Sequence, residues 1–327
     1  MKKVELSEHF TMRKMLIFSL PGIFQAFAAA SFALVDGYFV SNLLGLTPFV
    51  AVGLISPVFF MLCALGIVFG DGASALISKY RGEGDDERSK RVFTMTTVAM
   101  LIFGAIVGVA AAVLMPTFAH WVRADESNIA YCVAYGRTMV YFLPLFMVNS
   151  AYMSLWITAE KGWYGMIVAA INGALNVVLD WVFMGPLNMG VTGAALASSA
   201  GAVTSAVITL IYFSFPNRSA LKFTRFTLAD VRDLAQICFN GGSSLVGSIA
   251  GNITGLLANI QLVRYIGETG VAAMNVFLYI AGFFMAILFG ISTTAVTVAG
   301  YKYGEKHRDE LDSLVKNNTV LTLLSAY

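Results

Sequence analysis

Eight stretches of this sequence are apolar over about 20 residues or more, the length that an α-helix needs to cross the hydrocarbon core of a bilayer. Hydrophobic residues make up 58% of the chain and charged residues only 12%, which is outside the range of ordinary soluble domains. The sequence therefore predicts an all-α, polytopic membrane helical bundle. The expected spans are 15–42, 49–78, 92–116, 129–158, 163–185, 188–213, 236–264 and 269–300, and a ninth helix begins near Leu314.

The distribution of positive charge predicts how the bundle is oriented. The first apolar run, from Met15 to about Leu44, is too long for a cleaved signal peptide, so we interpret it as the first span. If the N-terminus is cytoplasmic, only three of the 21 Lys and Arg residues lie outside: Arg123, Arg137 and Arg264. Because cytoplasmic loops are enriched in Lys and Arg, we place the N-terminus in the cytoplasm and the protein in the inner (cytoplasmic) cell membrane.

A weak internal repeat divides the chain. When the sequence is shifted along itself so that Gly45 lies on Gly267, the same shift lays Gly82 on Gly304, and in each copy an outer turn of little charge is followed by a charged inner loop. Six spans separate corresponding points, so the copies have the same orientation and form a parallel repeat. We predict a six-helix N-terminal lobe over 1–215, a cytoplasmic inter-lobe loop over 216–235, and the start of a C-terminal lobe over 236–327. Since the chain ends opposite the middle of the third helix of the first copy, we expect the second lobe to be truncated.

Polar side chains inside the spans suggest a functional site. Asn172, Asn176 and Asp180 are spaced four apart and share one face of a helix. Counting from the outer turns puts Asp36 at a similar depth, in the outer half of the bilayer, and Ser198 adds a further oxygen. A carboxylate in hydrocarbon costs a few kcal/mol, so intramembrane acids are functional-site candidates. Two acids close together can share a proton or a small cation.

Other polar residues have more than one interpretation. We expect Gln25, Asn149, Asn172 and Asn259 to line a cavity, although Asn, Ser and Gln also serve as hydrogen-bonding contacts between membrane helices. Pro21 removes a backbone donor and Asp71 is flanked by glycines, so both are candidate helix hinges, and a direct transport role for Asp71 stays open. The three cysteines have no metal-ligand spacing and are interpreted as small core residues.

The sequence lacks the motifs of several other classes of protein. It contains no Walker-type phosphate loop, no HExxH motif, no nucleophile elbow and no GxGD motif. We therefore predict no enzyme activity, no cofactor and no structural metal, with small organic molecules and the lipid bilayer as partners, no nucleic acid, and a monomeric full-length protein. A Na⁺ ion at Asp36, Asn176 and Asp180 is compatible with these residue types.

Several motifs in order resemble the multidrug and toxic compound extrusion (MATE) family, in particular its MepA-like branch. They are LPGIFQ with Asp36 and Gly45, ALISKYRGEGD, NVVLDWVF followed by GVTGAALAS, and GYKYGE. The resemblance implies twelve helices in two six-helix lobes around a central cavity, and export of organic, often cationic, compounds in exchange for inward Na⁺ or H⁺.

The resemblance also implies which residues carry the coupling ion. The motif positions of the group that couples in its N-lobe fall on Asp36, Asn176, Asp180 and Ser198, the last of which is often Thr in the family. The chain departs from many relatives at Ile157, where Arg is common, and at Lys302, where Asn is common. Two alternatives remain: a flippase for a lipid-linked precursor, which would favour arginines in its cavity, and an inactive truncated remnant.

Overall fold

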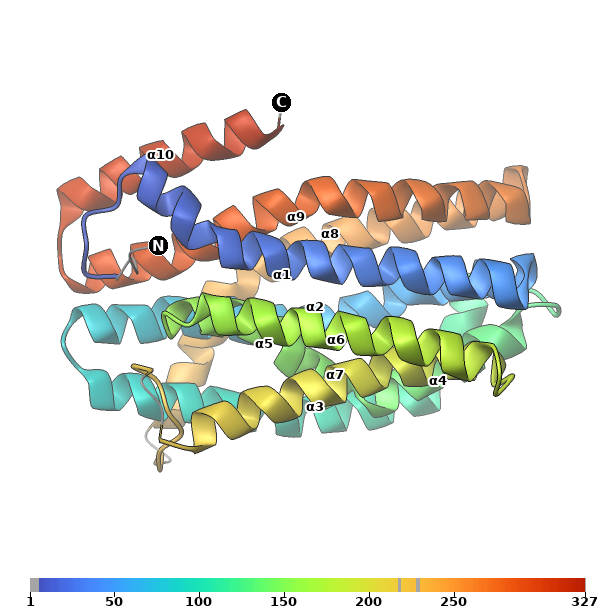
Figure 1. Ribbon diagram of the computed structural model, residues 1–327, viewed down its shortest axis with the longest axis horizontal. Coiled ribbons are helices and arrows are strands. Elements are labelled where there is room, and N and C mark those ends of the chain that lie inside the picture. Colours follow the sequence, from blue (N-terminus) through green and yellow to red (C-terminus); the bar gives the residue numbers. More distant parts are fainter. Residues whose placement is uncertain (1–5, 217–218, 228–229, 327) are drawn as a thin grey trace.

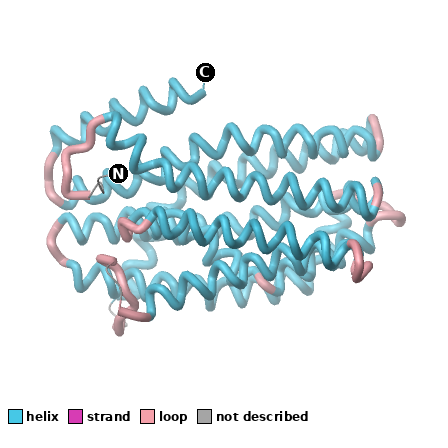
Figure 2. Tube along the Cα trace, viewed as in Figure 1, coloured by secondary structure: helices cyan, strands magenta, loops and turns pink. Residues whose placement is uncertain are grey.

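The computed structural model describes residues 6–216, 219–227 and 230–326 as a bundle of long helices (Figures 1 and 2). The N-terminal lobe contains α1 (Met12–Phe39), a π-helical turn (Val40–Leu44), α2 (Leu46–Gly82), α3 (Asp86–Trp121), α4 (Ile129–Tyr141), α5 (Leu143–Thr158), α6 (Gly162–Met184) and α7 (Gly190–Ser214). A short 3₁₀ turn (Asp230–Arg232) precedes α8 (Asp233–Tyr265), α9 (Glu268–Gly304) and α10 (Arg308–Ala326).

The helices agree with the spans expected from hydropathy. Seven helical segments of the described chain are long and apolar enough to cross a membrane, and α4 and α5 together make an eighth span that is bent by 65°. The bend falls at Phe142, two residues before Pro144 at the start of α5, where proline cannot continue the hydrogen-bond ladder. The helix predicted to begin near Leu314 is α10, and it begins earlier, at Arg308. Its described residues are less apolar than those of a membrane span.

Helix boundaries recur at the offset of the sequence repeat. Both α2 and α9 are 37 residues long, and each begins directly after a glycine with a positive φ, 95° at Gly45 and 81° at Gly267. Such a backbone conformation strains residues that have a Cβ atom, so glycine is favoured at both helix starts. The shift that relates Gly45 to Gly267 also relates the start of α3 to the start of α10. The shared boundaries support a parallel repeat of two lobes.

Small residues allow the helices of the N-terminal lobe to approach closely. Gly66 and Gly70, one turn apart on α2, face the backbone of α5. A Cβ atom added at Gly70 would lie 2.6 Å from both the Cα and the carbonyl oxygen of Ala151, and one added at Gly66 would lie 2.6 Å from the carbonyl oxygen of Met147. Close contact through small residues is a common basis of helix association in membranes.

We expect Gly70→Val to destabilise the N-terminal lobe by about 1–3 kcal/mol, the range for overpacking a dense interior. Backbone atoms of Ala151 cannot move aside as the tip of a flexible side chain could, so α2 and α5 would have to separate. Unfolding by a denaturing detergent would measure the loss. Gly242→Ala on α8 is the control, because no atom outside the adjacent part of its own helix lies within 4 Å of the added Cβ, and it should not destabilise the protein. Equal stability of the two variants would contradict this packing.

The two lobes touch at the end of the bundle that holds Gly82 and Gly304, which the distribution of Lys and Arg predicts to be cytoplasmic. We call this the inner end, and the end with Gly45 and Gly185 the outer end. A Cβ added at Gly82 of α2 would lie 2.1 Å from the carbonyl oxygen of Tyr301 on α9. In Figure 1, α9 runs alongside α1, and α10 lies at the inner end near the start of α1. These contacts join the two lobes at the inner end of the bundle.

Candidate functional site

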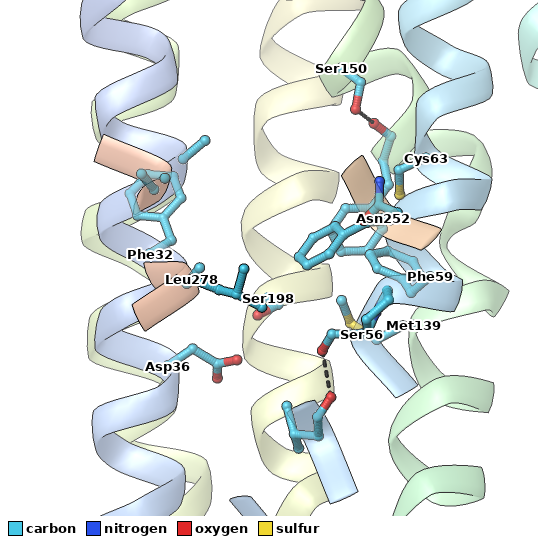
Figure 3. Close-up of a pocket in the computed structure, with 18 of the residues that line it drawn as sticks. Phe32, Asp36, Ser56, Phe59, Cys63, Met139, Ser150, Ser198, Asn252 and Leu278 are labelled. Atoms are coloured by element: carbon cyan, nitrogen blue, oxygen red, sulfur yellow. Dashed lines mark hydrogen bonds between the residues drawn. The ribbon is translucent and has the colours of Figure 1, made fainter. Parts of the chain in front are cut away.

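A cavity of about 440 Å³ lies between the two lobes (Figure 3). Helices α1, α2, α4, α5, α6 and α7 line it from one side, and α8 and α9 from the other. Aromatic and methionine side chains supply much of the wall: Phe32, Phe59, Phe60, Phe146, Met139 and Met153. Its polar groups include five amides, those of Asn149, Asn172, Asn176, Asn252 and Asn275. Among the described lining residues, Asp36 is the single charged group. The cavity therefore suits an apolar or aromatic molecule with hydrogen-bonding groups and positive charge.

Helix packing brings the Asp36 side chain to the edge of this cavity. Phe32 of α1 fits over Gly173 of α6 so closely that an added Cβ would lie 1.6 Å from the ring. Both helices run from the inner to the outer end. Asp36 is one turn beyond Phe32, about 6 Å further outward at about 1.5 Å per residue. Asp36 is 8% exposed, and its Oδ2 atom accepts a hydrogen bond from the Tyr135 hydroxyl at 3.5 Å.

The face of α6 that carries Asn172, Asn176 and Asp180 is turned toward α7 and the cavity. Asn176 donates from Nδ2 to the Ser198 hydroxyl on α7 at 3.2 Å, and Asp180 is fully buried. Asp180 is close enough to Asp36 for the two carboxylates to interact electrostatically. Figure 3 shows Asp36 and Ser198 on neighbouring sides of the same space. The structure thus brings together all four residues predicted for the coupling site, from α1, α6 and α7.

Several buried oxygens of this group have no hydrogen-bond partner. They are Oδ1 of Asp36, Oδ1 of Asn176, and both carboxylate oxygens of Asp180. Buried polar atoms are nearly always satisfied, so four such acceptors around one place require an explanation. All are oxygens, the ligand type that hard cations such as Na⁺ prefer, and a proton on either acid would also supply a donor. The described residues contain no group of three or more His, Cys, Asp and Glu side chains arranged to bind a metal.

The residues predicted to line a cavity divide into three cases. Asn149 and Asn172 line the main cavity, whereas Gln25 lines a neighbouring void of about 30 Å³ in the N-terminal lobe, which Asn149 and Asn172 also border. The prediction for Asn259 is corrected. This side chain is fully buried and donates to the carbonyl oxygen of Gly53 at 3.3 Å, because the rotation of α8 turns it toward α2.

Neither candidate hinge interrupts its helix. Helix α1 continues through Pro21, and the Gln25 side chain donates to the Pro21 carbonyl oxygen at 3.2 Å. Helix α2 continues through Asp71, which is buried and bonded to serines of α5 and α8. A hinge at either position stays a prediction.

Several residues of the site were not predicted from the sequence. Tyr135 contacts Asp36 from α4, and Asn252 and Asn275 supply the amides of the C-terminal lobe. Under the shift that lays Gly45 on Gly267, Asn275 corresponds to Gly53. The two positions are in direct contact, because a Cβ added at Gly53 would lie 1.8 Å from the Asn275 amide nitrogen. No sequence signal marks Tyr135, because its contact depends on how α4 is placed by the bend after it.

A family model described as MatE matches residues 21–182 and 244–327, which is well over half of the chain. The chain belongs to the MatE family. The multidrug export protein MepA of Staphylococcus saprophyticus is 24% identical over 292 residues, covering 88% of this chain and 64% of the relative. MepA of Staphylococcus aureus strain MRSA252 is 25% identical over 294 residues, covering 89% and 64%. The chain thus spans about two thirds of the length of these curated relatives.

Solved structures of transporters share the fold. A multidrug resistance MATE family transporter of the MOP superfamily, in an outward-facing conformation, aligns with a TM-score of 0.86 at 23% identity, covering 99% of this chain and 72% of that one. A MOP superfamily transporter from Pyrococcus furiosus, titled as having a binding pocket of reverse polarity, aligns with a TM-score of 0.85 at 23% identity and the same coverage. These likenesses support the all-α fold predicted for the MatE chain from its sequence.

Proposed function

We propose that this MatE protein is a membrane antiporter that exports organic, often cationic, compounds from the cell in exchange for inward H⁺ or Na⁺. The observation that carries the proposal is the group of unpartnered buried oxygens on Asp36, Asn176 and Asp180. An oxygen-only site with two acids binds a positive ion. Its position at the edge of a cavity lined by aromatic side chains couples that ion to a larger ligand.

The geometry suggests how the two ligands exclude each other. Asp36 belongs both to the ion site and to the wall of the cavity, where it is the single charged residue among those described. When a cation enters from outside and neutralises the carboxylate pair, a cationic substrate loses its attraction to the cavity and is released outward. Repacking of α1 at Pro21, where a backbone donor is missing, would accompany this change.

Export of a lipid-linked precursor is the second candidate, and the cavity disfavours it. A pyrophosphate group is best bound by Arg or Lys, and no described residue of either type lines the cavity. The multidrug export named for the staphylococcal relatives fits the aromatic wall and the lone acid better. The names of these relatives also support a location in the cell membrane and a transport role rather than catalysis.

Membrane vesicles containing the protein would test the proposed antiport. Ethidium, a fluorescent aromatic cation, would be followed while either a Na⁺ gradient or a pH gradient is imposed alone. One of the two gradients should drive ethidium against its own gradient, and dissipating it should stop the movement. Ethidium movement that is independent of both gradients would refute antiport. Translocation of a lipid-linked pyrophosphate analogue without ethidium export would favour the second candidate.

A further inference from the structure

Asp71 is a third buried acid of the membrane-spanning helices, and the proposed exchange does not use it. It lies in the inner half of α2, is 7% exposed, and lines neither the main cavity nor the smaller void. Its Oδ1 atom accepts a hydrogen bond from Ser154 of α5, in the same lobe. Its Oδ2 atom accepts a hydrogen bond at 2.7 Å from Ser244 of α8, in the other lobe. Each oxygen of one carboxylate is therefore bonded to a different lobe.

The backbones of α2 and α8 touch directly around this carboxylate. A Cβ added at Gly72 would lie 2.0 Å from the carbonyl oxygen of Ile237, and one added at Gly241 would lie 2.2 Å from the carbonyl oxygen of Val68. Glycines on both helices thus allow the approach that brings Ser244 within reach of Asp71. The acid therefore lies at a close contact between the lobes, on the inner side of the cavity.

A second polar contact crosses between the lobes one turn further inward. The Ser74 hydroxyl lies 2.8 Å from the Thr297 hydroxyl of α9 and 2.7 Å from the Thr158 hydroxyl of α5. Ser74 and Asp71 are on the same face of α2, three residues apart. The two contacts repeat one arrangement, in which a side chain of α2 binds α5 of its own lobe and a helix of the other lobe.

The chemistry of Asp71 favours a device that holds the lobes together and can also release them. An ionised carboxylate offers acceptors alone, so it pairs with two hydroxyl donors at once, and hydrogen bonds to a charged group are about twice as strong as neutral ones. An apolar residue would hold the lobes together permanently at a lower free-energy cost, because burying a charge in a membrane is unfavourable. An exporter must open its inner end to load substrate, and that movement would break the bond between Asp71 and Ser244.

We propose that Asp71 and Ser244 form an inter-lobe latch that keeps the inner end of the bundle closed. The proposal rests on the proposed export function, because only a protein that alternates between two openings needs a releasable contact here. Asp71 is a positioning residue in this proposal and does not touch the transported compound. Helix α2 is continuous from Leu46 to Gly82, so the structure supports a latch at this position more than a hinge.

A buried thiol at the inner contact would report the opening. Ser78 of α2 is fully buried, and an added Cβ on Gly300 of α9 would lie 3.2 Å from the Ser78 Cβ. With Cys63, Cys132 and Cys238 replaced by Ala, Ser78→Cys is the single thiol of the chain. Its alkylation by a membrane-impermeant maleimide would be timed in inside-out vesicles, without substrate and without an ion gradient. The rate reflects the fraction of molecules that are open at the inner end.

Ser244→Ala and Asp71→Asn are each expected to raise the alkylation rate about tenfold, because each removes or weakens the hydrogen bond between Ser244 and Asp71. Thr254→Ala is the control on the same helix, since the Thr254 hydroxyl donates to the Ala250 carbonyl of α8 itself, and it should leave the rate unchanged. The Asp71→Asn and Ser244→Ala double variant should open no more than the stronger single variant, because both act on one bond.

Unchanged alkylation in both single variants would overturn the latch, and so would a rise of the same size in Thr254→Ala. If the Asp71→Asn variant fails to insert in the membrane, the Ser244→Ala variant still tests the proposal, because it removes only one hydroxyl group. The readout needs no transported ion or compound. A failure of the ethidium experiment with a positive alkylation result would therefore remove the antiport while leaving the latch.

Discussion

Asp180→Asn is expected to lower gradient-driven ethidium export by at least a hundredfold, while the protein still inserts and binds ethidium. Breaking a buried charge interaction by removing one partner costs about 3–5 kcal/mol, which corresponds to more than a hundredfold in ion affinity. Asp180 is fully buried and both of its carboxylate oxygens lack partners, so no other group among those described takes its place. The asparagine keeps the shape of the side chain and removes the charge.

The measurement compares ethidium export with ethidium binding. Binding should persist because Asp180 does not line the cavity. Asp36→Asn should lose both export and part of the binding, since Asp36 belongs to the ion site and to the cavity wall. Asp312→Asn, at an exposed position of α10, is the control and should export normally. Export at the normal rate by Asp180→Asn would contradict the assignment of the ion site.

Glu160→Met should destabilise the N-terminal lobe by about 3–5 kcal/mol, the cost of leaving one member of a buried ion pair without its partner. Arg81, near the inner end of α2, binds Glu160 at 2.8 Å and donates to the Thr158 carbonyl oxygen at 2.8 Å. The two side chains are only 11% and 12% exposed, so water screens them little. The pair joins α2 to the turn between α5 and α6.

The double variant Arg81→Met and Glu160→Met distinguishes the net contribution of the ion pair to stability from the cost of leaving one partner unpaired. Replacing both partners by apolar residues is often nearly neutral, so the double variant should be more stable than Glu160→Met alone. Glu87→Gln is the control, because Glu87 is 70% exposed and its pair with Lys90 should contribute little. Unfolding in a denaturing detergent would rank the variants. A double variant as unstable as the single one would show that the effect is not electrostatic.

Hydropathy predicted most of the fold because a membrane fixes helix length more strictly than water does. The eight spans and the repeat that pairs Gly45 with Gly267 depend on properties that are read along the chain. The grouping of Asp36 with Asp180 was also within reach, because the number of residues between a side chain and the outer turn gives its depth, at about 1.5 Å per residue.

Rotation of a helix about its own axis was harder to predict than depth. Asn259 has the depth expected of a cavity residue but faces the backbone of α2. Tyr135 reaches Asp36 because α4 is displaced by a 65° bend, and the size of a bend is set by tertiary packing. In helices that are apolar on nearly every side, no amphipathic pattern identifies the inward face.

The shared helix boundaries of α2 and α9 also constrain which insertions the protein can accept. One residue added in the middle of α2 would turn everything after it by about 100°, since an α-helix has about 3.6 residues per turn. That rotation would carry Asp71 and Ser74 away from α8 and α9 together. The same residue added at Gly84, in the exposed turn after α2, would not change which residues of any helix face its neighbours. Length variation among natural variants should therefore collect in such turns, and α2 should keep its 37 residues.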